Sequence, residues 1–409
     1  MLLLYNLGIH IYHLLIRFAA LFNNKARLWI AGRKGIFEQL SKTLAPTSAP
    51  LIWVHCASLG EFEQARPVIE ALKKEKKTTQ ILLTFFSPSG YEIRKDYNLA
   101  DHVFYLPIDT PSNAKRFLDL TKPDLVFFVK YEFWYHYLQA LHKRQIPAYL
   151  ISATFHPKQP FFNKIYGRFF RSMLYCFRRI FVQNEASAKL LDQLNISHFE
   201  VAGDTRIDRV LAIAEKAERI PKIEAFKGNQ SILIGGSTWP PDEKILTAFI
   251  NQDQSDWKYI IAPHDISLAH MEQIEQLLNV PHQRYSSFRA DLSSKVLIID
   301  NIGLLSRIYQ YGKLAYIGGG FGVGIHNTLE PIAFRLPVLF GPKYEKFEEA
   351  TQLLATGGAF LVEEYADFEQ HFLYLQATEN HQIAASAASA YLSANQGATE
   401  RIMEYLRQG

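Results

Sequence analysis

Short apolar runs alternate with amphipathic segments along most of this chain. The first pair is residues 51–57, an uncharged run rich in β-formers, and a helical segment that begins at Glu61. In that segment Val68, Ile69 and Leu72 share one face, so we expect them to pack against a sheet. A strand, a short turn and a helix in this order are the first half of a βαβ unit.

The alternation continues as two series, separated by a charged, helix-prone segment at residues 206–230. The first series predicts strands at residues 51–57, 81–87, 102–108, 125–130, 148–153, 179–183 and 199–202. The second predicts strands at residues 231–235, 259–262, 296–299, 314–317, 337–340 and 360–362, and a last helix over 383–407. Several runs are apolar on both faces, as parallel strands covered by helices are. We therefore predict an α/β fold of two doubly wound, Rossmann-like domains facing a central cleft, where ligands would bind.

The expected domains are a membrane-anchor segment (1–35), an N-terminal domain (36–208) and a C-terminal domain (209–409) whose last helix can pack back on the N-terminal one. Residues 1–22 are apolar enough for a membrane span, but His10, His13 and Arg17 interrupt them. Basic residues follow directly, which would hold that flank on the cytoplasmic side. The alternatives are a short single-pass anchor, an interfacial helix and a buried soluble helix.

The composition of the chain limits the possible classes of protein. A chain of 409 residues with 48% hydrophobic residues predicts a globular protein of two domains. A net charge of +4 argues against a nucleic-acid partner. Cys56 and Cys176 have no metal-ligand spacing, so we expect two reduced, buried thiols and no structural zinc.

Two regions carry candidate chemistry, each at the carboxyl ends of predicted strands. Glu61 lies in the first turn of its helix, where a carboxylate either acts as a general base or complements the helix dipole. The second region is the glycine-rich stretch 318–324, followed by Asn327 and Glu330 at a helix start. Glu330 could bind a ribose, or Asn327 and Glu330 could form a capping box. His264 ends another strand, and it could contact a ligand or cap the helix expected at Ile266.

These stretches together resemble the 3-deoxy-D-manno-octulosonic acid (Kdo) transferases of lipid A glycosylation. The resemblance covers nearly the whole chain and rests on the apolar N-terminal segment and on HCASLGE (55–61), FVQNE (181–185), IGGST (234–238), HNTLEP (326–331) and PVLFGP (337–342). It implies a two-domain GT-B glycosyltransferase that uses CMP-Kdo, needs no catalytic metal or cofactor, and acts at the inner face of the cytoplasmic membrane.

The resemblance also implies roles for individual residues. Glu61 would be the catalytic base. CMP would be contacted by Pro263, His264, Ile302, Gly303, Leu304, Asn327, Thr328, Leu329 and Glu330. Lys130 and Arg206 would steady the transition state. Many members have Pro-Arg-His where this chain has Pro263-His264-Asp265, and many have Glu at the position of Lys130. These two departures put the roles of His264 and Lys130 in doubt.

The sequence thus predicts an inverting enzyme that moves Kdo from CMP-Kdo to a lipid A precursor (lipid IVA) at a membrane surface. Another GT-B enzyme, a UDP-sugar transferase or epimerase, is the alternative, and a non-enzymatic membrane scaffold is a third class. Residues 161–181 fit one amphipathic helix, whose basic side, from Lys164 to Arg179, would face an anionic membrane.

Overall fold

The computed structural model describes residues 1–44, 49–290 and 293–408. The chain forms two compact units, one of residues Met1–Asp208 with Gln396–Gly409 and the other of residues Arg209–Asn395. The second unit is therefore inserted into the first, because the last fourteen residues return to the unit in which the chain began.

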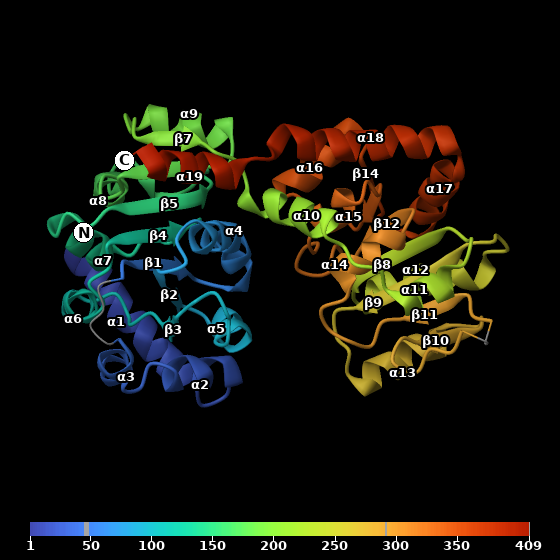
Figure 1. Cartoon of the computed structure of the whole chain (residues 1–409), viewed down its shortest axis with the longest axis horizontal. Helices are drawn as coiled ribbons and strands as arrows, with labels where there is room; N and C mark the ends of the chain where they lie inside the picture. The colour runs from blue at the N-terminus through green and yellow to red at the C-terminus, as the bar shows by residue number, and fades with distance from the viewer. Residues whose placement is uncertain (45–48, 291–292, 409) are drawn as a thin grey trace. The chain divides into compact units, whose positions relative to one another are not determined.

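A seven-stranded parallel sheet in the order β3-β2-β1-β4-β5-β6-β7 forms the centre of the first unit (Figure 1). Its strands are β1 (Leu51–Cys56), β2 (Gln80–Phe85), β3 (His102–Tyr105), β4 (Leu125–Val129), β5 (Ala148–Ala153), β6 (Arg179–Val182) and β7 (Phe199–Val201). The helices are α1 (Leu2–Ala19), α2 (Asn24–Ala31), α3 (Ile36–Thr43), α4 (Leu59–Glu75), α5 (Pro88–Arg94), α6 (Pro111–Thr121), α7 (Tyr135–Lys143), α8 (Gly167–Leu174), α9 (Glu185–Gln193) and α19 (Ala398–Gln408). All seven expected strands are present, and the doubly wound prediction is confirmed for this unit.

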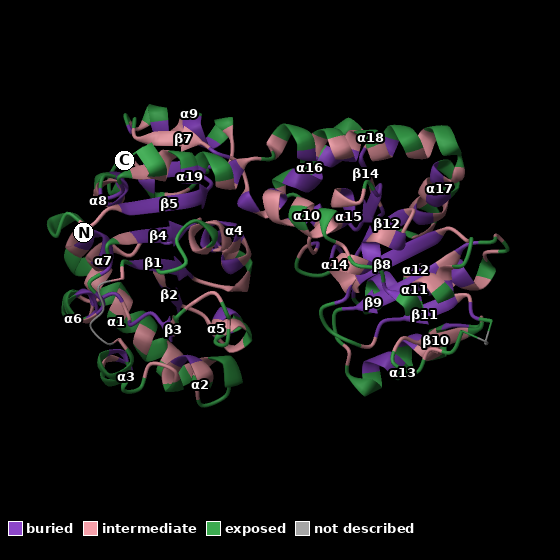
Figure 2. Ribbon diagram, in the orientation of Figure 1, coloured by how far each residue is buried: buried purple, intermediate pink, exposed green. Residues whose placement is uncertain are grey.

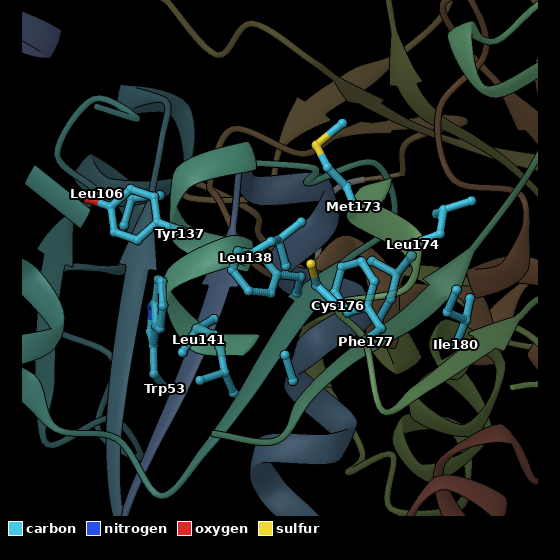
Figure 3. Packing of buried hydrophobic residues seen from close by; sticks show 14 of the residues in the cluster. Trp53, Leu106, Tyr137, Leu138, Leu141, Met173, Leu174, Cys176, Phe177 and Ile180 are labelled. Carbon is cyan, nitrogen blue, oxygen red and sulfur yellow. The ribbon is translucent and has the colours of Figure 1, made fainter. Parts of the chain in front are cut away.

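Both faces of this sheet are covered, as the uncharged strands predicted. Along β1, Trp53 packs into the cluster on one face, with Tyr137, Leu138 and Phe177 (Figure 3). Val54 on the same strand points to the other face, where helix α4 lies. The central strands are consequently buried throughout (Figure 2), and Cys56 and Cys176 are buried free thiols as expected.

The second unit is built around another seven-stranded parallel sheet, in the order β10-β11-β9-β8-β12-β13-β14. Its strands are β8 (Ile232–Thr238), β9 (Lys258–Pro263), β10 (His282–Arg284), β11 (Val296–Ile298), β12 (Leu314–Ile317), β13 (Val338–Phe340) and β14 (Ala359–Leu361). Its helices are α11 (Pro221–Lys227), α12 (Pro240–Gln252), α13 (Leu268–Leu277), α14 (Leu305–Ile308), α15 (Leu329–Ala333), α16 (Glu348–Thr356), α17 (Tyr365–Gln376) and α18 (Thr378–Asn395), and α10 (Thr205–Glu215) leads into the unit. The six expected strands are confirmed, and the edge strand β10 was not expected.

The prediction of one amphipathic helix over residues 161–181 is wrong. The segment contains a 3-10 turn at Pro160–Phe162, helix α8 and the start of strand β6. The Asn163 carboxamide accepts bonds from two backbone N–H groups just after it, which turns the chain before α8. Ile165, expected to pack on the domain, is 91% exposed, and Arg171 donates to the Phe161 carbonyl. No single basic face therefore forms along this segment.

The helical character expected for residues 383–407 is confirmed, but it is divided between two helices. Helices α18 and α19 are separated at Gly397, which has a φ of +90° and ends the first of them. The Asp208 carboxylate accepts bonds at 2.6 Å from the backbone N–H groups of Gly397 and Thr399. Helix α19 then buries Ile402 and Met403 in the core of the first unit.

Helix α1 is attached to the first unit by one side only. Tyr5 donates a 2.6 Å hydrogen bond to Asp109, and Asn6 lies 2.6 Å from His136. None of the residues of α1 is buried (Figure 2). The expectation of a buried soluble helix is therefore wrong, and α1 is long and apolar enough to meet the length and composition of a membrane span.

Candidate active site

Glu61 lies where strand β1 passes into helix α4, at the carboxyl edge of the first sheet. Its carboxylate turns back and accepts a hydrogen bond from the backbone N–H of Ala57. Burial raises the pKa of Glu61 to about 8, and the negative charge of Glu132 raises it further, against the opposing effects of the Ala57 N–H and the Lys130 cation. A helix dipole alone would lower the pKa of this carboxyl, so burial and the charge of Glu132 outweigh the dipole at Glu61.

Glu132 is a second buried carboxylate at this edge, and the sequence did not reveal it. It follows strand β4, the neighbour of β1 in the sheet. Its Oε2 atom accepts from Trp134 Nε1 at 2.6 Å and lies 2.9 Å from His55 Nε2. The other ring nitrogen of His55 lies 2.8 Å from the Thr84 hydroxyl. His55 belongs to the stretch 55–61, Glu132 lies in none of the motifs, and only the adjacency of β1 and β4 brings the two residues together.

The structure places Lys130 and Arg206, the two predicted stabilisers, in the same unit. Lys130 has a φ of +59° directly after β4, and its positive charge lowers the pKa values of both Glu61 and Asp204. Arg206 donates from Nε to Asp204 at 2.8 Å, so part of its charge is neutralised there. We call Glu61, Glu132 and Lys130 the carboxylate cluster. It combines a carboxyl of raised pKa, Glu61, with a nearby cation that favours the ionised form of that carboxyl.

In the second unit, His264 forms a stack of rings with two partners that the sequence did not pair with it. The Trp239 ring lies 4.6 Å from the His264 ring, and the His326 ring lies 4.7 Å from it on stacked planes. Trp239 Nε1 donates to His326 Nε2 at 2.9 Å. Burial, followed by the neighbouring His264, lowers the pKa of His326 to about 4, so this ring is neutral and can accept that bond. We call these three residues the ring stack.

His264 does not cap a helix, which was the alternative for this residue. Helix α13 begins at Leu268, two residues later than expected. The Asp265 carboxylate, and not His264, accepts the bonds from the Ser267 N–H and hydroxyl. The exposed imidazole of His264 is therefore left at the edge of the sheet beside Trp239.

The glycines after strand β12 pack against protein backbone. A Cβ at Gly318 would lie 2.3 Å from the Ser237 carbonyl oxygen, and one at Gly320 would lie 2.5 Å from Gly341 Cα. Asp242 holds the same turn by accepting from the Gly319 N–H at 2.9 Å. At these positions glycine is required by close contact within the fold.

Asn327 and Glu330 are joined, but not as a capping box. Asn327 Nδ2 donates to Glu330 Oε1 at 3.0 Å, and Asn327 Oδ1 accepts from the Leu329 N–H. In a capping box the glutamate would bond to the backbone of the N-cap residue. Burial raises the pKa of Glu330, while the Asn327 bond and the charge of Arg209 lower it. Arg209 is a further member of this site that sequence analysis missed.

The other residues predicted to contact the nucleotide differ in how far their side chains are exposed. Ile302 is 87% exposed, whereas Thr328 is fully buried. Further core positions among the predicted contacts are Pro263, Leu304 and Leu329. Gly303 has a φ of +91° before helix α14. Contacts to a nucleotide from the buried positions would have to come from the backbone.

Comparison with known proteins identifies the family. Residues 31–209 match the family model described as 3-deoxy-D-manno-octulosonic-acid transferase (kdotransferase). The 3-deoxy-D-manno-octulosonic acid transferase of Aquifex aeolicus is 30% identical over 316 residues, which are 75% of this chain and 80% of that protein. The Haemophilus influenzae protein of the same name is 26% identical, over 87% of this chain and 86% of its own length.

Solved structures support the fold. The UDP-GlcNAc 2-epimerase of Neisseria meningitidis matches 88% of this chain and all of its own, with a TM-score of 0.64 and 18% identity. MurG of Acinetobacter baumannii matches the same shares with a TM-score of 0.55 and 13% identity. At such identities these likenesses concern the fold alone, and they confirm the predicted GT-B architecture of two parallel-sheet domains. With the sequence relatives, they establish that the chain belongs to the 3-deoxy-D-manno-octulosonic acid transferase family and is a glycosyltransferase of GT-B fold.

Proposed function

We propose that this enzyme transfers Kdo from CMP-Kdo to a lipid A precursor, lipid IVA, with inversion at the anomeric carbon. The observation that carries the proposal is the position of Glu61 in a chain of this family. Its pKa of about 8 suits a group that must gain and release a proton near neutral pH.

In the proposed step, Glu61 takes the proton from an acceptor hydroxyl while that oxygen forms a bond to the anomeric carbon of Kdo. The bond from that carbon to the CMP phosphate breaks, and CMP leaves with the electron pair. At pH 7, a pKa of about 8 leaves roughly one Glu61 in ten ionised. That fraction already includes the effect of Lys130, whose cation favours the ionised carboxylate. The proposal includes no metal and no cofactor, as the family resemblance implies.

In the second unit, we propose that Glu330 holds the ribose of CMP and that the ring stack lies against the rest of the nucleotide. Glu330 is fixed by Asn327 and accompanied by Arg209, so it is oriented before a ligand arrives. His264 and Trp239 offer flat ring surfaces of the kind on which bases stack.

The UDP-sugar alternative is not favoured. Its support is the likeness to epimerases at 18% identity, which extends to the fold only. The Aquifex aeolicus and Haemophilus influenzae relatives, which match 75% and 87% of this chain, are named for Kdo transfer.

Two measurements test the proposal. The purified enzyme, incubated with CMP-Kdo and lipid IVA, should yield a glycolipid whose mass is increased by one or more Kdo units. Calorimetry should show binding of CMP and much weaker binding of UDP. Absence of the product, or tighter binding of UDP than of CMP, would contradict the proposed reaction.

We further propose that the enzyme acts at the inner face of the cytoplasmic membrane, with α1 lying in the interface. The side of α1 away from Asp109 carries large exposed apolar side chains, among them Leu14, Leu15 and Phe18 at 66%, 59% and 64% exposure. Deleting α1 would also remove the Tyr5–Asp109 bond, so point changes are the cleaner test.

Changing Leu14, Leu15 and Phe18 to Ser should abolish co-sedimentation with anionic phospholipid vesicles at high salt while leaving the melting temperature within a few degrees. A matched control changes three exposed apolar residues of the second unit to Ser, namely Leu268, Leu373 and Ile383. Vesicle binding that is lost equally in both variants, or in neither, would contradict the proposed location.

A further inference from the structure

A cavity of about 700 Å³ lies in the first unit, outside the carboxylate cluster. Its walls come from helices α1, α2 and α3, from the turn after α2 and from the start of α6. None of its lining residues belongs to the short motifs at residues 55–61, 181–185, 234–238, 326–331 and 337–342 or takes part in the proposed chemistry. The side chains that decide its chemistry are Arg17, Trp29, Arg33, Lys34, Phe37 and Arg116.

The cavity has an excess of positive charge. Arg17, Arg33, Lys34 and Arg116 line it, and the lining carboxylate Glu38 is bound to Lys42 at 2.7 Å. Among the residues that the structure describes, no carboxylate lies within ion-pair distance of those four cations. A site with four cations and one carboxylate already paired favours an anionic ligand.

Arg33 is the most firmly held of these cations. It donates to the carbonyl oxygens of Trp29, Phe86 and Leu106 at 3.0, 2.7 and 2.8 Å. Its guanidinium also lies 3.7 Å from the centre of the Trp29 ring. Carbonyls and rings orient this cation but carry no full negative charge, so its field remains available to a ligand in the cavity.

Most of the other lining residues are apolar, among them Ile30, Ile36 and Ile108. The Phe37 ring lies against Arg116, with the guanidinium carbon 4.5 Å from the ring centre. On α1, the lining residues His13 and Arg17 are each followed by an exposed apolar residue, Leu14 and Phe18. A ligand with an anionic head in the cavity could therefore place a hydrocarbon chain along the apolar side of α1, which indicates an amphiphile.

One layer of rings joins the cavity to the carboxylate cluster. The Trp29 ring lies 5.6 Å from the Phe86 ring, and Phe86 lies 4.6 Å from Trp134. Trp134 in turn donates to Glu132. The side chains of Trp29, Phe86 and Trp134 thus form a continuous series of contacts from the cavity wall to Glu132.

We infer that this cavity binds the phosphate-bearing end of the lipid acceptor, and this inference rests on the proposed function. Lys34 and Arg116 would bind the phosphate from the rim, Arg33 would supply a fixed positive field, and α1 would contact the acyl chains. The occupant is a phosphorylated lipid and not a free anion, because the apolar walls and α1 adjoin the cations.

The kinetic test compares two double variants of the full chain. Changing Lys34 and Arg116 to Gln should raise the apparent KM for lipid IVA at least tenfold and leave the CMP affinity and the kcat at saturating acceptor within twofold. The matched control changes Lys25 and Lys115 to Gln. These two lysines are exposed on α2 and α6, and neither lines the cavity. An equal KM in the two double variants would overturn the inference.

A binding test is independent of catalysis. The tryptophan fluorescence of the wild type should change when dihexanoyl phosphatidic acid binds. The same titration of a Trp29→Phe variant gives the part of the signal that does not come from Trp29. The affinity should fall at least tenfold in the Lys34 and Arg116 variant and should be at least tenfold weaker for inorganic phosphate or dihexanoyl phosphatidylcholine. Inorganic phosphate binding as tightly as the lipid would show a free-anion site and overturn the inference. If the wild type binds the lipid phosphate but makes no Kdo product, the proposed function fails while the lipid site stands.

Discussion

The carboxylate cluster and the ring stack occupy corresponding edges of two similar sheets, yet they differ in the kind of side chain and in its exposure to water. In the first unit, the Glu61 carboxyl is half-buried and the Glu132 carboxyl is buried, and the charge of Glu132 raises the pKa of Glu61. In the second unit, Trp239 and His264 are exposed rings that contact one another by their faces. Proton transfer needs a perturbed pKa, which burial supplies, whereas holding a nucleotide needs surfaces that remain open to it.

This contrast predicts that changes in the first unit alter turnover and changes in the second alter affinity. The largest effect should come from Glu61→Gln, which removes the proton acceptor and keeps the shape. Turnover should fall by roughly 10²–10⁴-fold, with CMP affinity unchanged in calorimetry. The control Glu70→Gln, on the same helix but bound to Arg66 at 2.7 Å, should retain full turnover. Near-normal turnover of a folded Glu61→Gln enzyme would show that changes in the first unit do not act on turnover through Glu61.

Glu330→Ala should give the opposite pattern in the second unit. The CMP affinity should fall at least tenfold, which is about 1.4 kcal/mol, with kcat at saturating donor nearly unchanged. Glu345→Ala, an exposed glutamate of the same unit, is the control. If Glu330 served only the local bond to Asn327, the variant would instead lose about 0.5–2 kcal/mol of stability and bind CMP normally.

Glu132→Gln sharpens the contrast through pH. Removing the second negative charge should lower the pKa of Glu61, so the acid limb of kcat/KM, near pH 8 in the wild type, should move down by about one pH unit. Lys130→Met should move it up, because the cation that favours ionised Glu61 is lost. Profiles of the three enzymes from pH 5 to 10 measure this, and shifts in the reverse directions would show that the cluster does not control the base.

The free energy of unfolding should depend on pH through the ionisation of Glu61, and the direction of that dependence can be stated. The folded pKa of Glu61 is about 8 and its usual value is 4.5, so folding favours the protonated form. That contribution is present in full below pH 4.5 and is lost as the pH rises through 8. The Gln side chain of Glu61→Gln cannot ionise. The melting temperature of this variant, relative to that of the wild type, should therefore increase as the pH rises from 5 to 9.

His264→Ala should have the smallest effect, a loss of CMP affinity of a few fold with no change in kcat. The family resemblance implies an arginine at this position, and a stacking ring contributes less than a charged contact to phosphate. Calorimetry at pH 8, where His326 is neutral, avoids interference from its titration. A hundredfold loss would show that His264 makes a stronger contact than stacking.

The sequence revealed most of the sheets because their strands are continuous apolar runs. It missed β10, whose residues His282–Arg284 are all polar, since an edge strand is not required to be apolar. It wrongly continued a helix through residues 161–181 because a helical period of apolar residues persists where Cys176 and Phe177 are buried in a turn. Periodicity alone does not distinguish a buried turn from a helix.

The candidate sites were only partly predictable for a different reason. Glu61, Asn327 and Glu330 could be proposed because each stands in a motif at a predicted strand end. Glu132 and Arg209 act through neighbours that are distant in the sequence, and their partners depend on which strands and helices lie side by side. A single sequence gives the order of strands along the chain but not their order across the sheet.

The return of α19 to the first unit has a consequence for how the protein is made. Ile402 and Met403 complete a core whose other members, such as Val54 and Phe62, are synthesised near the start of the chain. At about 5–20 residues per second, synthesis of the intervening unit takes roughly ten seconds or more. During that interval the nascent first unit exposes the apolar strip that α19 will cover, so it is then a substrate for chaperones. A ribosome-stalled chain ending at residue 395 should accordingly bind a chaperone that the released full-length protein does not.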